Sequence, residues 1–541
     1  MNSKQLKEVS ERLFSKRQKM MMLWQEISEN FYVERADFTV RREIGDDYAG
    51  HLSTSYPLQC RRDLGDQIST MLRPPGKEWF HIGTIDGAED NDAKRWLEAS
   101  AAIQRRAMYD RKSQFEKACS QADHDYSTFG QLVMSVRPNR TLDTLMYRTW
   151  HLRDVVWSEN DEGVVDFVAR KWRPNARTLV ALFPGSVDDK IKRASDKDPF
   201  AEYDCLHICC QADMFDGNAN GQPYFSIYYD CANNKPLEEV ATWNKEYIIP
   251  RWLTVSGSQY AYSPATVIAL PDARLIQAMT YTLLEAGEKA TNPPIIATQD
   301  VVRSDMALYA GGITWVDMEY DEKLGAALRP MPLDLKGMPI GIDMQRDARE
   351  LIMRAFFLNK LTLPRTDGKE RTAYEISQMV QEYIRGAIPI FGPMEPEYNG
   401  ALCEATFEIL MRYGAFGSPH DMPRSLRGRE IQFRFESPLH DLIEQVKGQK
   451  WLEAKAILAD AAAIDQSAIA LVDAKVALRD VLAGIGVPSK WVRSEVTVAQ
   501  IEEAQQAAAE AQQALAAMQQ GAATAKDLGS AQKDFADAEA V

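Results

Sequence analysis

The sequence predicts an α+β fold with several domains, in which helices come first and antiparallel strands follow. Three observations predict it. Apolar residues recur at helical spacing from Leu6 to Phe31, and from about Leu132 the period changes to two. Two long helical segments of matched length then enclose a shorter, strand-rich segment. The chain has 541 residues, which is enough for more than one domain.

The N-terminal region is predicted to be helical. One long amphipathic helix is expected over residues 6–31, because its apolar residues keep a single helical face. A second helix over residues 64–72 ends at a Pro-Pro-Gly sequence, which cannot continue it. Two further helices are expected at 93–109 and 115–126.

An antiparallel sheet region follows these helices. Its predicted strands are the runs LVMSV, LMYRTWHL, VVWS, GVVDFVARKW, DCLHICCQAD and YFSIYYD. The sequence MFDGNANGQ joins the last two runs.

A hairpin of two long helices is predicted in the middle of the chain. The first helix is expected to start at Pro271 and to stop at Asn292, before two prolines, and the second runs over about 340–361. The insert between them becomes a small module at the tip of the hairpin. The polar, basic stretch LPRTDGKERT follows, and then a helical region to about Tyr413, broken at Pro389 and at Gly392 with its following proline.

The C-terminal region from residue 439 is expected to be almost wholly helical. Thr497 and Gln500 form a capping box. A narrow seam of mostly small residues follows at spacings of three and four: Ile501, Ala504, Ala508, Ala511, Leu515 and Met518. Because alanine buries little area, this segment is either a frayed tail or a helix that packs against neighbouring copies, and we favour the second.

Composition limits the possible functions. The net charge is −15, so the chain as a whole is not a tight, general nucleic-acid binder. Seven scattered cysteines favour a reducing compartment over a disulfide framework. Residues 252–271 are uncharged but too polar to span a bilayer, and the N-terminus has no signal-peptide pattern. We therefore expect a soluble protein, made inside the cell, that does not act at a membrane.

The motifs that suggest chemistry are incomplete. Gly76-Lys77 does not form a phosphate-binding loop, because Met71 stands where a glycine is needed and Glu78 follows the lysine. DGNANG matches half of an EF-hand loop, but the position of its last ligand is Ile227, so a turn is expected. We therefore predict no enzyme activity and no cofactor.

One further group could suggest a metal. Cys205, His207 and Cys209 lie on one face of a predicted strand, yet no second pair of ligands accompanies them. They are predicted to be small buried residues, and no metal site is expected.

Four stretches, in this order, carry a resemblance that covers nearly the whole chain. They are LGDQISTMLRPPGKEWFHI, WSENDEGVVDFVARKW, IPRWLTVSGSQYAYSPATVIALPDARLIQAM and LNKLTLPRTDGKERTAYEISQMVQEYIRGAIPIFGPMEPEY. Together they resemble the portal, or head-to-tail connecting, protein of short-tailed bacteriophages. By this resemblance the Pro-Pro-Gly loop is a structural stop, and Trp79 and Phe80 anchor it in the core.

The resemblance implies a portal-type subunit that assembles into a cyclic ring. The implied regions are a wing of helices and antiparallel strands over 1–268, a first stem helix over 269–291, a small α/β clip over 292–338, a second stem helix over 339–361, a tunnel loop over 362–371, a connecting helix and strand over 372–438, and a helical crown over 439–541.

The resemblance also implies a function and partners. Twelve subunits would form a channel at one capsid vertex of the virion, through which double-stranded DNA passes during packaging and ejection. The ring would dock the terminase motor and later the tail adaptor proteins, and it would contact the major capsid and scaffold proteins.

Two sets of site residues follow from the resemblance. The tunnel loop would bring Arg365, Lys369 and Arg371 to the DNA, although a solvated surface loop is the alternative. In the clip, the strand GGITWVDM would place Ile313, Trp315 and Val316 at an interface that serves ring closure and docking.

Two other functions are alternatives to a portal. A packaging motor or nuclease would need a Walker loop or a clustered acidic metal site, and neither is visible in the sequence. A soluble head-tail adaptor or scaffold protein without a DNA channel stays as the alternative.

Overall fold

The computed structural model describes residues 1–293 (except 44, 48, 86–89 and 140), 295–297, 328–330, 337–361, 382, 385–418, 420–436 and scattered positions between 451 and 512. The chain divides into two compact units, each built from separate segments. The larger contains Met1–His81, Ser100–Pro419 and Phe433–Leu439, and the smaller contains Ile82–Ala99, His420–Gln432 and His440–Val541.

The N-terminal helix is broken in two. The structure has α1 (Ser3–Lys16) and α2 (Gln18–Phe31), so the prediction of one long helix was wrong. At the break, the buried Arg17 guanidinium donates hydrogen bonds to the carbonyl oxygens of Leu152 and Arg153 at 2.6 and 2.7 Å and to that of Val155. Apolar periodicity continues across the break, so it could not reveal this long-range contact.

The next three helices agree with the prediction. They are α3 (Tyr56–Leu72), α4 (Asn91–Met108) and α5 (Phe115–Phe129). After α3, Trp79 and Phe80 are buried, with 1% and 0% of their surface exposed, and Trp79 donates a hydrogen bond to the hydroxyl of Tyr109 at 3.0 Å. The two aromatic residues therefore anchor the Pro-Pro-Gly loop in the core, as predicted.

The sheet region is antiparallel, as predicted. A three-stranded sheet has the order β3-β2-β9, and a five-stranded sheet has the order β4-β5-β6-β7-β8. Their strands are β2 (Val133–Pro138), β3 (Leu145–Trp150), β9 (Tyr247–Ile248), β4 (Val155–Glu159), β5 (Val165–Trp172), β6 (Cys205–Gln211), β7 (Tyr224–Asp230) and β8 (Lys235–Thr242).

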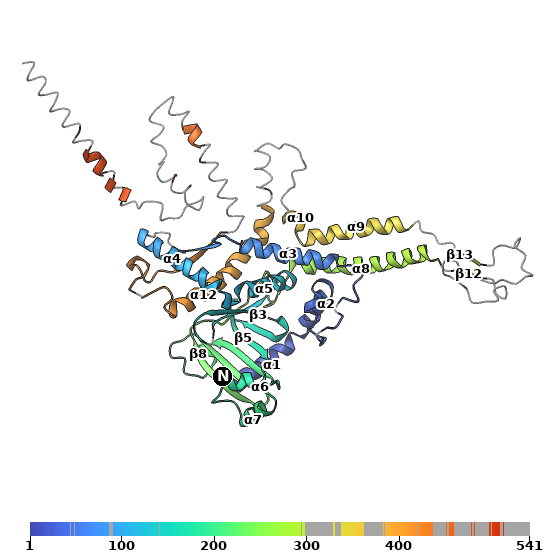
Figure 1. Ribbon diagram of the computed structural model, residues 1–541, viewed down its shortest axis with the longest axis horizontal. Coiled ribbons are helices and arrows are strands. Elements are labelled where there is room, and N and C mark those ends of the chain that lie inside the picture. The colour runs from blue at the N-terminus through green and yellow to red at the C-terminus, as the bar shows by residue number, and fades with distance from the viewer. Residues whose placement is uncertain are drawn as a thin grey trace, which may run out of the picture. The chain divides into compact units, whose positions relative to one another are not determined.

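Helices cover both faces of the five-stranded sheet. Leu6 of α1 packs with Ile208 and Ile227 on one face. On the other face, Cys205 and Tyr228 pack with α6 (Ala176–Leu182) and α7 (Asp189–Lys197). These two helices lie between β5 and β6 in the chain and were not predicted. Figure 1 shows the sheet with α1, α6 and α7 against it.

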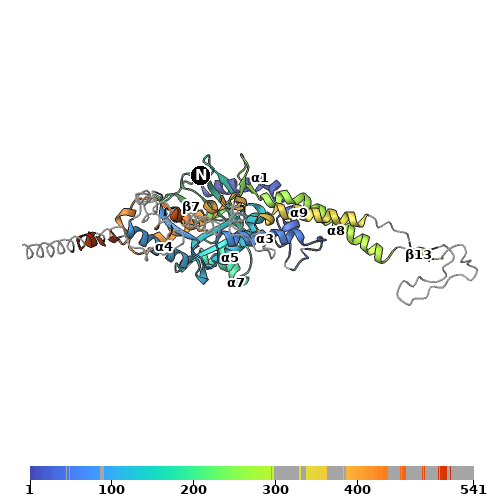
Figure 2. The same cartoon turned by 90° about the horizontal axis from the view of Figure 1, so that it is seen from above.

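Two long helices leave this region as a pair. They are α8 (Pro264–Thr291) and α9 (Met338–Ala355), which lie side by side in both views (Figures 1 and 2). The predicted start at Pro271 was wrong, because Ser263 caps the helix, Pro264 occupies its first turn, and Pro271 lies inside it. Proline suits the first turn of a helix, so two candidate starts were present and the earlier one is used.

The second long helix is also shorter than predicted. It ends at Ala355, and a separate turn, α10 (Leu358–Leu361), follows. Between them, Phe357 has a φ of 59°, a left-handed conformation that costs a non-glycine residue roughly 1–3 kcal/mol. Phe356 is fully buried there, with its ring centroid 5.4 Å from that of Phe31, and this packing fixes the turn.

The remaining elements are short. A π-helix, η6 (Glu395–Gly400), runs into α12 (Ala401–Arg412) after the predicted break at Gly392, whereas the chain stays helical through Pro389. The two-stranded sheets pair β1 (Phe80–Thr84) with β14 (Ile431–Phe435), β10 (Leu253–Thr254) with β11 (Ala261–Tyr262), and β12 (Ile295–Ala297) with β13 (Leu328–Pro330). The 3-10 turns are η1 (Val33–Arg35), η2 (Arg111–Ser113), η3 (Leu152–Asp154), η4 (Ala212–Met214) and η7 (Arg424–Leu426).

In the C-terminal region, every position between 451 and 512 that the structure describes is helical, as predicted. Across the part of the chain that the structure describes, no helix combines the length and the apolar character needed to cross a bilayer.

A buried ion pair joins three elements of the larger unit. Arg73, directly after α3, is paired with Asp123 of α5, and the side chains are 4% and 1% exposed. Arg73 also donates to the amide oxygen of Asn399 at 2.8 Å, and Asn399 donates to the carbonyl of Leu72 at 2.9 Å. Burial alone lowers the pKa of Arg73, but Asp123 raises it well above its usual value, so the guanidinium is charged. The π-helix thus places the Asn399 side chain in hydrogen-bond contact with the end of α3.

Candidate functional site

The base of α8 is fixed to the end of α5 by two hydroxyl groups. Ser263 donates to the carbonyl of Ser127 and Thr266 donates to that of Thr128, both at 2.7 Å. These carbonyls lie in the last turn of α5, where no helical partner is available. Gly130 ends α5 with a φ of 71°, and a Cβ there would lie 2.2 Å from the carbonyl carbon of Tyr262. The α5–α8 junction therefore depends on small side chains in close contact.

The first half of the helix pair is buried in the larger unit. Ala265, Ala269 and Ala273 of α8 are 0% exposed, and Ile352 of α9 is also 0% exposed. The amide of Gln277 accepts hydrogen bonds from the backbone of residues 53 and 54 at 2.8 and 2.9 Å and donates to the carbonyl of residue 54 at 2.9 Å. This half of the pair is therefore rigidly attached to the segment before α3.

The second half of the pair is held mainly by helix-to-helix contacts. Gln345 of α9 donates to the hydroxyl of Thr280 at 2.7 Å. One turn further along α8, a Cβ added to Gly341 would lie 3.0 Å from Leu283. Because later positions of α8 meet earlier positions of α9, the two helices are antiparallel.

Large apolar side chains are exposed on this second half. Tyr281 and Leu284 of α8 are 65% and 57% exposed, and Ile340, Ile342 and Met344 of α9 are 64%, 54% and 51% exposed. Single exposed apolar residues are common, but a group on one pair of helices indicates a surface that another molecule covers. Ile340 and Ile342, two residues apart in a helix, point to nearly opposite sides of α9, so the five residues lie on more than one side of the pair. We name them together the α8–α9 apolar surface. This surface was not predicted as a site, although Tyr281 and Leu284 are spaced three apart in the sequence.

The residues predicted to form the site lie outside the described residues. These are Arg365, Lys369 and Arg371 of the tunnel loop, and Ile313, Trp315 and Val316 of the clip. The structure describes what flanks the clip insert, where Ile295 of β12 pairs with Pro330 of β13 between the two long helices. The two described strands lie between the long helices in the chain, and the fold of the rest of the insert stays a prediction.

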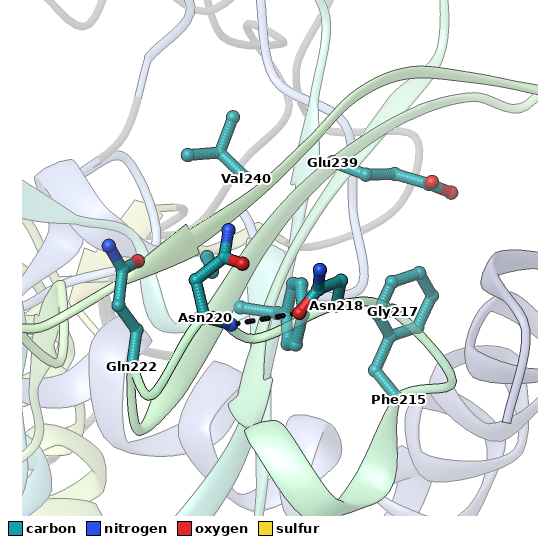
Figure 3. Close-up of a pocket in the computed structure, with 9 residues that line it drawn as sticks. Phe215, Gly217, Asn218, Asn220, Gln222, Glu239 and Val240 are labelled. Atoms are coloured by element: carbon teal, nitrogen blue, oxygen red, sulfur yellow. Dashed lines mark hydrogen bonds between the residues drawn. The ribbon is translucent and has the colours of Figure 1, made fainter.

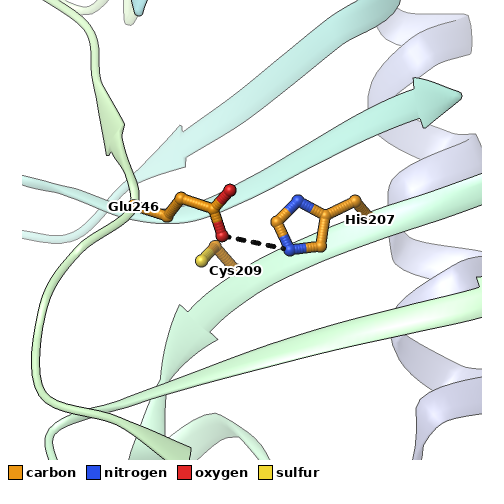
Figure 4. Close-up of side chains that lie close together, drawn as sticks. All are labelled: His207, Cys209 and Glu246. Atoms are coloured by element: carbon orange, nitrogen blue, oxygen red, sulfur yellow. Dashed lines mark ion pairs between the residues drawn. The ribbon is translucent and has the colours of Figure 1, made fainter. Parts of the chain in front are cut away.

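The histidine and cysteine group on β6 forms a buried polar cluster (Figure 4). His207 and Cys209 lie with Glu246, and their ligand atoms are within 4.8 Å of one another, whereas Cys205 packs on the α6–α7 face. Glu246 was missed because it lies in the distant loop before β9. Both ring nitrogens of His207 have partners, at 2.5 Å from the Tyr247 hydroxyl and 2.8 Å from that of Ser226.

The charges around this cluster disfavour a metal ion. Burial and the nearby Arg170 and Arg137 lower the pKa of His207 well below its usual value, and burial raises the pKa of the Cys209 thiol. Burial also raises the pKa of Glu246, against the effect of the two arginines, and Arg137 lies 3.9 Å from its carboxylate. The three ligands are one fewer than a closed zinc site needs, and two guanidinium groups repel a cation. Cys205, His207 and Cys209 are buried, as predicted, and the absence of a metal site stays a prediction.

The stretch DGNANG forms a turn between β6 and β7, as predicted (Figure 3). Asn220 and Gly221 have left-handed φ values of 48° and 78°, and Asn218 accepts a hydrogen bond from the Asn220 backbone at 3.2 Å. Ile227, at the last ligand position of an EF-hand loop, is fully buried in β7. The turn lines a surface pocket of about 390 Å³ together with Glu239 and Val240 of β8.

Comparisons with known proteins identify relatives of the chain. A family model described as bacteriophage head to tail connecting protein matches residues 3–492. The portal protein of Salmonella phage epsilon15 is 22% identical over 392 residues, which cover 70% of this chain and 68% of that protein. The probable portal protein of Bordetella phage BPP-1 is 22% identical over 439 residues, which cover 79% and 77%.

Among solved structures, a chain from the virion of a native gene transfer agent particle aligns with a TM-score of 0.36 and 8% identity. The alignment covers 80% of this chain and 95% of the gene transfer agent chain.

Proposed function

This chain belongs to the family of bacteriophage head to tail connecting proteins, and we propose that it is a portal subunit that forms a ring of twelve around a DNA channel. The ring would occupy one vertex of the capsid, where it binds the packaging motor, and later the tail adaptor proteins, and conducts double-stranded DNA in both directions.

The observation that carries this proposal is the α8–α9 apolar surface. The helix pair is firmly attached at its base, yet Leu284 and Ile342 stand more than half exposed farther along. A surface of this kind on every copy, in contact with a different surface of the next copy, makes a head-to-tail interface that closes into a ring when the rotation permits. The small-residue helix near residue 500 would add contacts between copies in the crown.

The regions named from the resemblance become part of this proposal. Residues 1–268 form the wing, 269–291 and 339–361 the stem, 292–338 the clip, and 439–541 the crown, with 372–438 connecting wing and crown. In the clip, Ile313, Trp315 and Val316 would pair with the neighbouring subunit and dock the motor and tail. Contacts of the wing and crown with capsid and scaffold proteins complete the set of partners.

Native mass spectrometry and class-averaged electron microscopy of the purified full chain test the ring. We expect a closed ring with a central hole and a mass near twelve times the subunit mass of 61.0 kDa. A stable monomer at micromolar concentration would contradict the proposal. A compact assembly with no central hole would instead support the alternative, a head-tail adaptor or scaffold protein without a channel.

The tunnel loop, residues 362–371, tests the channel separately. A strongly acidic ring lets DNA slide, because it does not hold phosphates, and a few cations on a loop would contact them transiently. Replacing Arg365, Lys369 and Arg371 by alanine is expected to leave ring assembly intact and to change the length of DNA packaged. Replacement by glutamate is expected to do so more severely through repulsion.

The readout is the length of packaged DNA in capsids built with each variant, beside ring integrity by microscopy. The matched control reverses three exposed cations of α7, Lys190, Arg193 and Lys197, which should leave packaging unchanged. Normal packaging by the glutamate variant of the tunnel loop would show that its cations never contact DNA.

A further inference from the structure

The two edges of the five-stranded sheet differ. At one edge, β4 is covered by side chains of the same subunit: Arg17 donates to the carbonyl of Val155, and Gln259 donates to that of Trp157 at 2.9 Å. At the other edge, β8 pairs with β7 and with no further strand in the described part of the chain. An uncovered edge strand presents backbone N–H and C=O groups that another strand can pair with.

Two surface pockets flank this free edge on opposite faces of the sheet. The register pairs Ala241 with Phe225, which faces α1, and Glu238 with Tyr228, which faces α6 and α7. On the α1 face, the pocket of about 390 Å³ is lined by Glu239 and by polar residues of the β6–β7 turn (Figure 3). On the other face, a pocket of about 490 Å³ has a mainly polar lining, made by residues 182–186 and by Pro236, Leu237, Glu238 and Glu239.

The part of β8 that another strand could pair with is short and acidic. Pro236 lacks a backbone N–H, and the β7–β8 register shifts at Tyr228 and leaves Leu237 unpaired, so regular pairing is limited to residues 238–242. Glu238, Glu239 and Val240 are exposed within this stretch, and Val240 is 44% exposed. The edge therefore offers a short strand with one carboxylate on each face of the sheet, and that of Glu239 also accepts a hydrogen bond from the hydroxyl of Ser3.

A second copy of the chain is a poor occupant. In the registers of a β8–β8 pair that set Glu238 or Glu239 opposite a glutamate of the other copy, like charges on directly opposed residues destabilise the sheet. The β4 edge of another copy is already covered by Arg17 and Gln259. Charge complementarity favours a basic segment instead.

We propose that β8 binds an extended, basic segment of a partner protein as a sixth strand of the sheet. In an added strand, alternate side chains point to opposite faces and so enter the two pockets in turn. A lysine or arginine would enter the polar pocket beside Glu239. The alternate side chains would enter the second pocket, beside Leu237 and Glu238. The proposal does not depend on ring formation or on a channel.

The probe is an acetylated, fluorescein-labelled octapeptide of alternating lysine and valine, titrated into the full chain and followed by fluorescence anisotropy. We expect saturable binding, and none with alternating glutamate and valine or with the lysine peptide N-methylated at every second amide. Binding should slow hydrogen exchange of those backbone amides in residues 238–242 that point away from β7, because an added strand protects them. Binding without this protection would show that the peptide is attracted by charge alone and would overturn the proposal.

The variant is Glu238→Lys combined with Glu239→Lys, and the matched control is Asp161→Lys combined with Glu162→Lys at the exposed β4–β5 turn of the same sheet. The first is expected to weaken binding of the lysine peptide about tenfold or more and to bind the glutamate peptide. The control should change the affinity less than about twofold. Equal weakening by both pairs would overturn the proposal.

Hydrogen exchange of the unmodified chain provides a measurement that does not depend on how the variants fold. Alternate amides of β8 already pair with β7, so the informative amides are those that point away from β7. Full protection of these outward amides before any peptide is added would show that another part of this chain or a second copy already occupies the edge. That outcome would also overturn the proposal.

Discussion

Replacing Leu284 and Ile342 together by lysine is expected to abolish ring assembly and to leave the subunit folded. Both residues belong to the α8–α9 apolar surface and are 57% and 54% exposed, so a lysine at either position is solvated in the free subunit. In a subunit interface, the same lysine would bury an unpaired charge, at a cost on the order of 2–4 kcal/mol per interface. Since every interface of a ring carries the cost, monomers are expected at micromolar concentration.

Native mass spectrometry measures the assembly, and circular dichroism on heating checks the fold. The matched control replaces two other exposed apolar residues by lysine: Leu142 in the β2–β3 loop and Val164 at the start of β5, which are 62% and 50% exposed. The control should assemble as the unmodified chain does. Full rings from the Leu284 and Ile342 variant would show that the apolar surface serves another partner.

The second large effect concerns the buried ion pair. Replacing Asp123 by alanine is expected to destabilise the larger unit by about 3–5 kcal/mol, because it leaves the Arg73 guanidinium buried without its counter-ion. Asn399 still accepts one hydrogen bond from Arg73, but a neutral amide does not balance the charge. Replacing both partners with apolar residues, Arg73→Met with Asp123→Leu, is expected to restore much of the loss, since no charge then stays buried.

Thermal and chemical denaturation measure these changes. The control is Lys112→Ala, which removes an exposed ion pair with Asp143 at 3.0 Å and should leave the unfolding midpoint nearly unchanged. A double variant as unstable as Asp123→Ala alone would show that the packing of Arg73 on Tyr398, whose ring centroid is 4.7 Å away, matters more than the charge.

Local patterns were sufficient for most elements of the fold. Strands such as β6 and β7 have apolar runs bounded by turn sequences, and α3 ends where Pro74 stops it, so each was predictable from its own residues. The errors arose from distant contacts. The break at Arg17 depends on carbonyls near residue 153, and the end of α9 depends on packing of Phe356 against Phe31. Because these contact partners are far apart in the sequence, the residues next to Arg17 or Phe356 do not reveal them.

The site was predictable only in part. Paired helices around an insert followed from length and capping, but exposure of Tyr281 or Ile342 depends on which helix face the rest of the subunit covers. Glu246 joins His207 through the fold, and its own sequence neighbourhood gives no sign of this. The covered β4 edge and the open β8 edge are likewise indistinguishable by strand pattern, because Arg17 and Gln259 come from distant segments.

The junction between α5 and α8 has a mechanical consequence. Two hydroxyl groups at the start of α8 are hydrogen-bonded to consecutive carbonyls of α5. The backbone of Gly130 lies so close to that of Tyr262 that no side chain fits between them. Such a junction acts as a clamp and not as a hinge, because bending it would stretch both bonds at once. A torque on the far end of the helix pair is thus transmitted to α5, which also carries Asp123. We therefore expect α8 and α5 to move together as one stiff unit, so that a force on the far end of the long helices reaches the helix that carries Asp123.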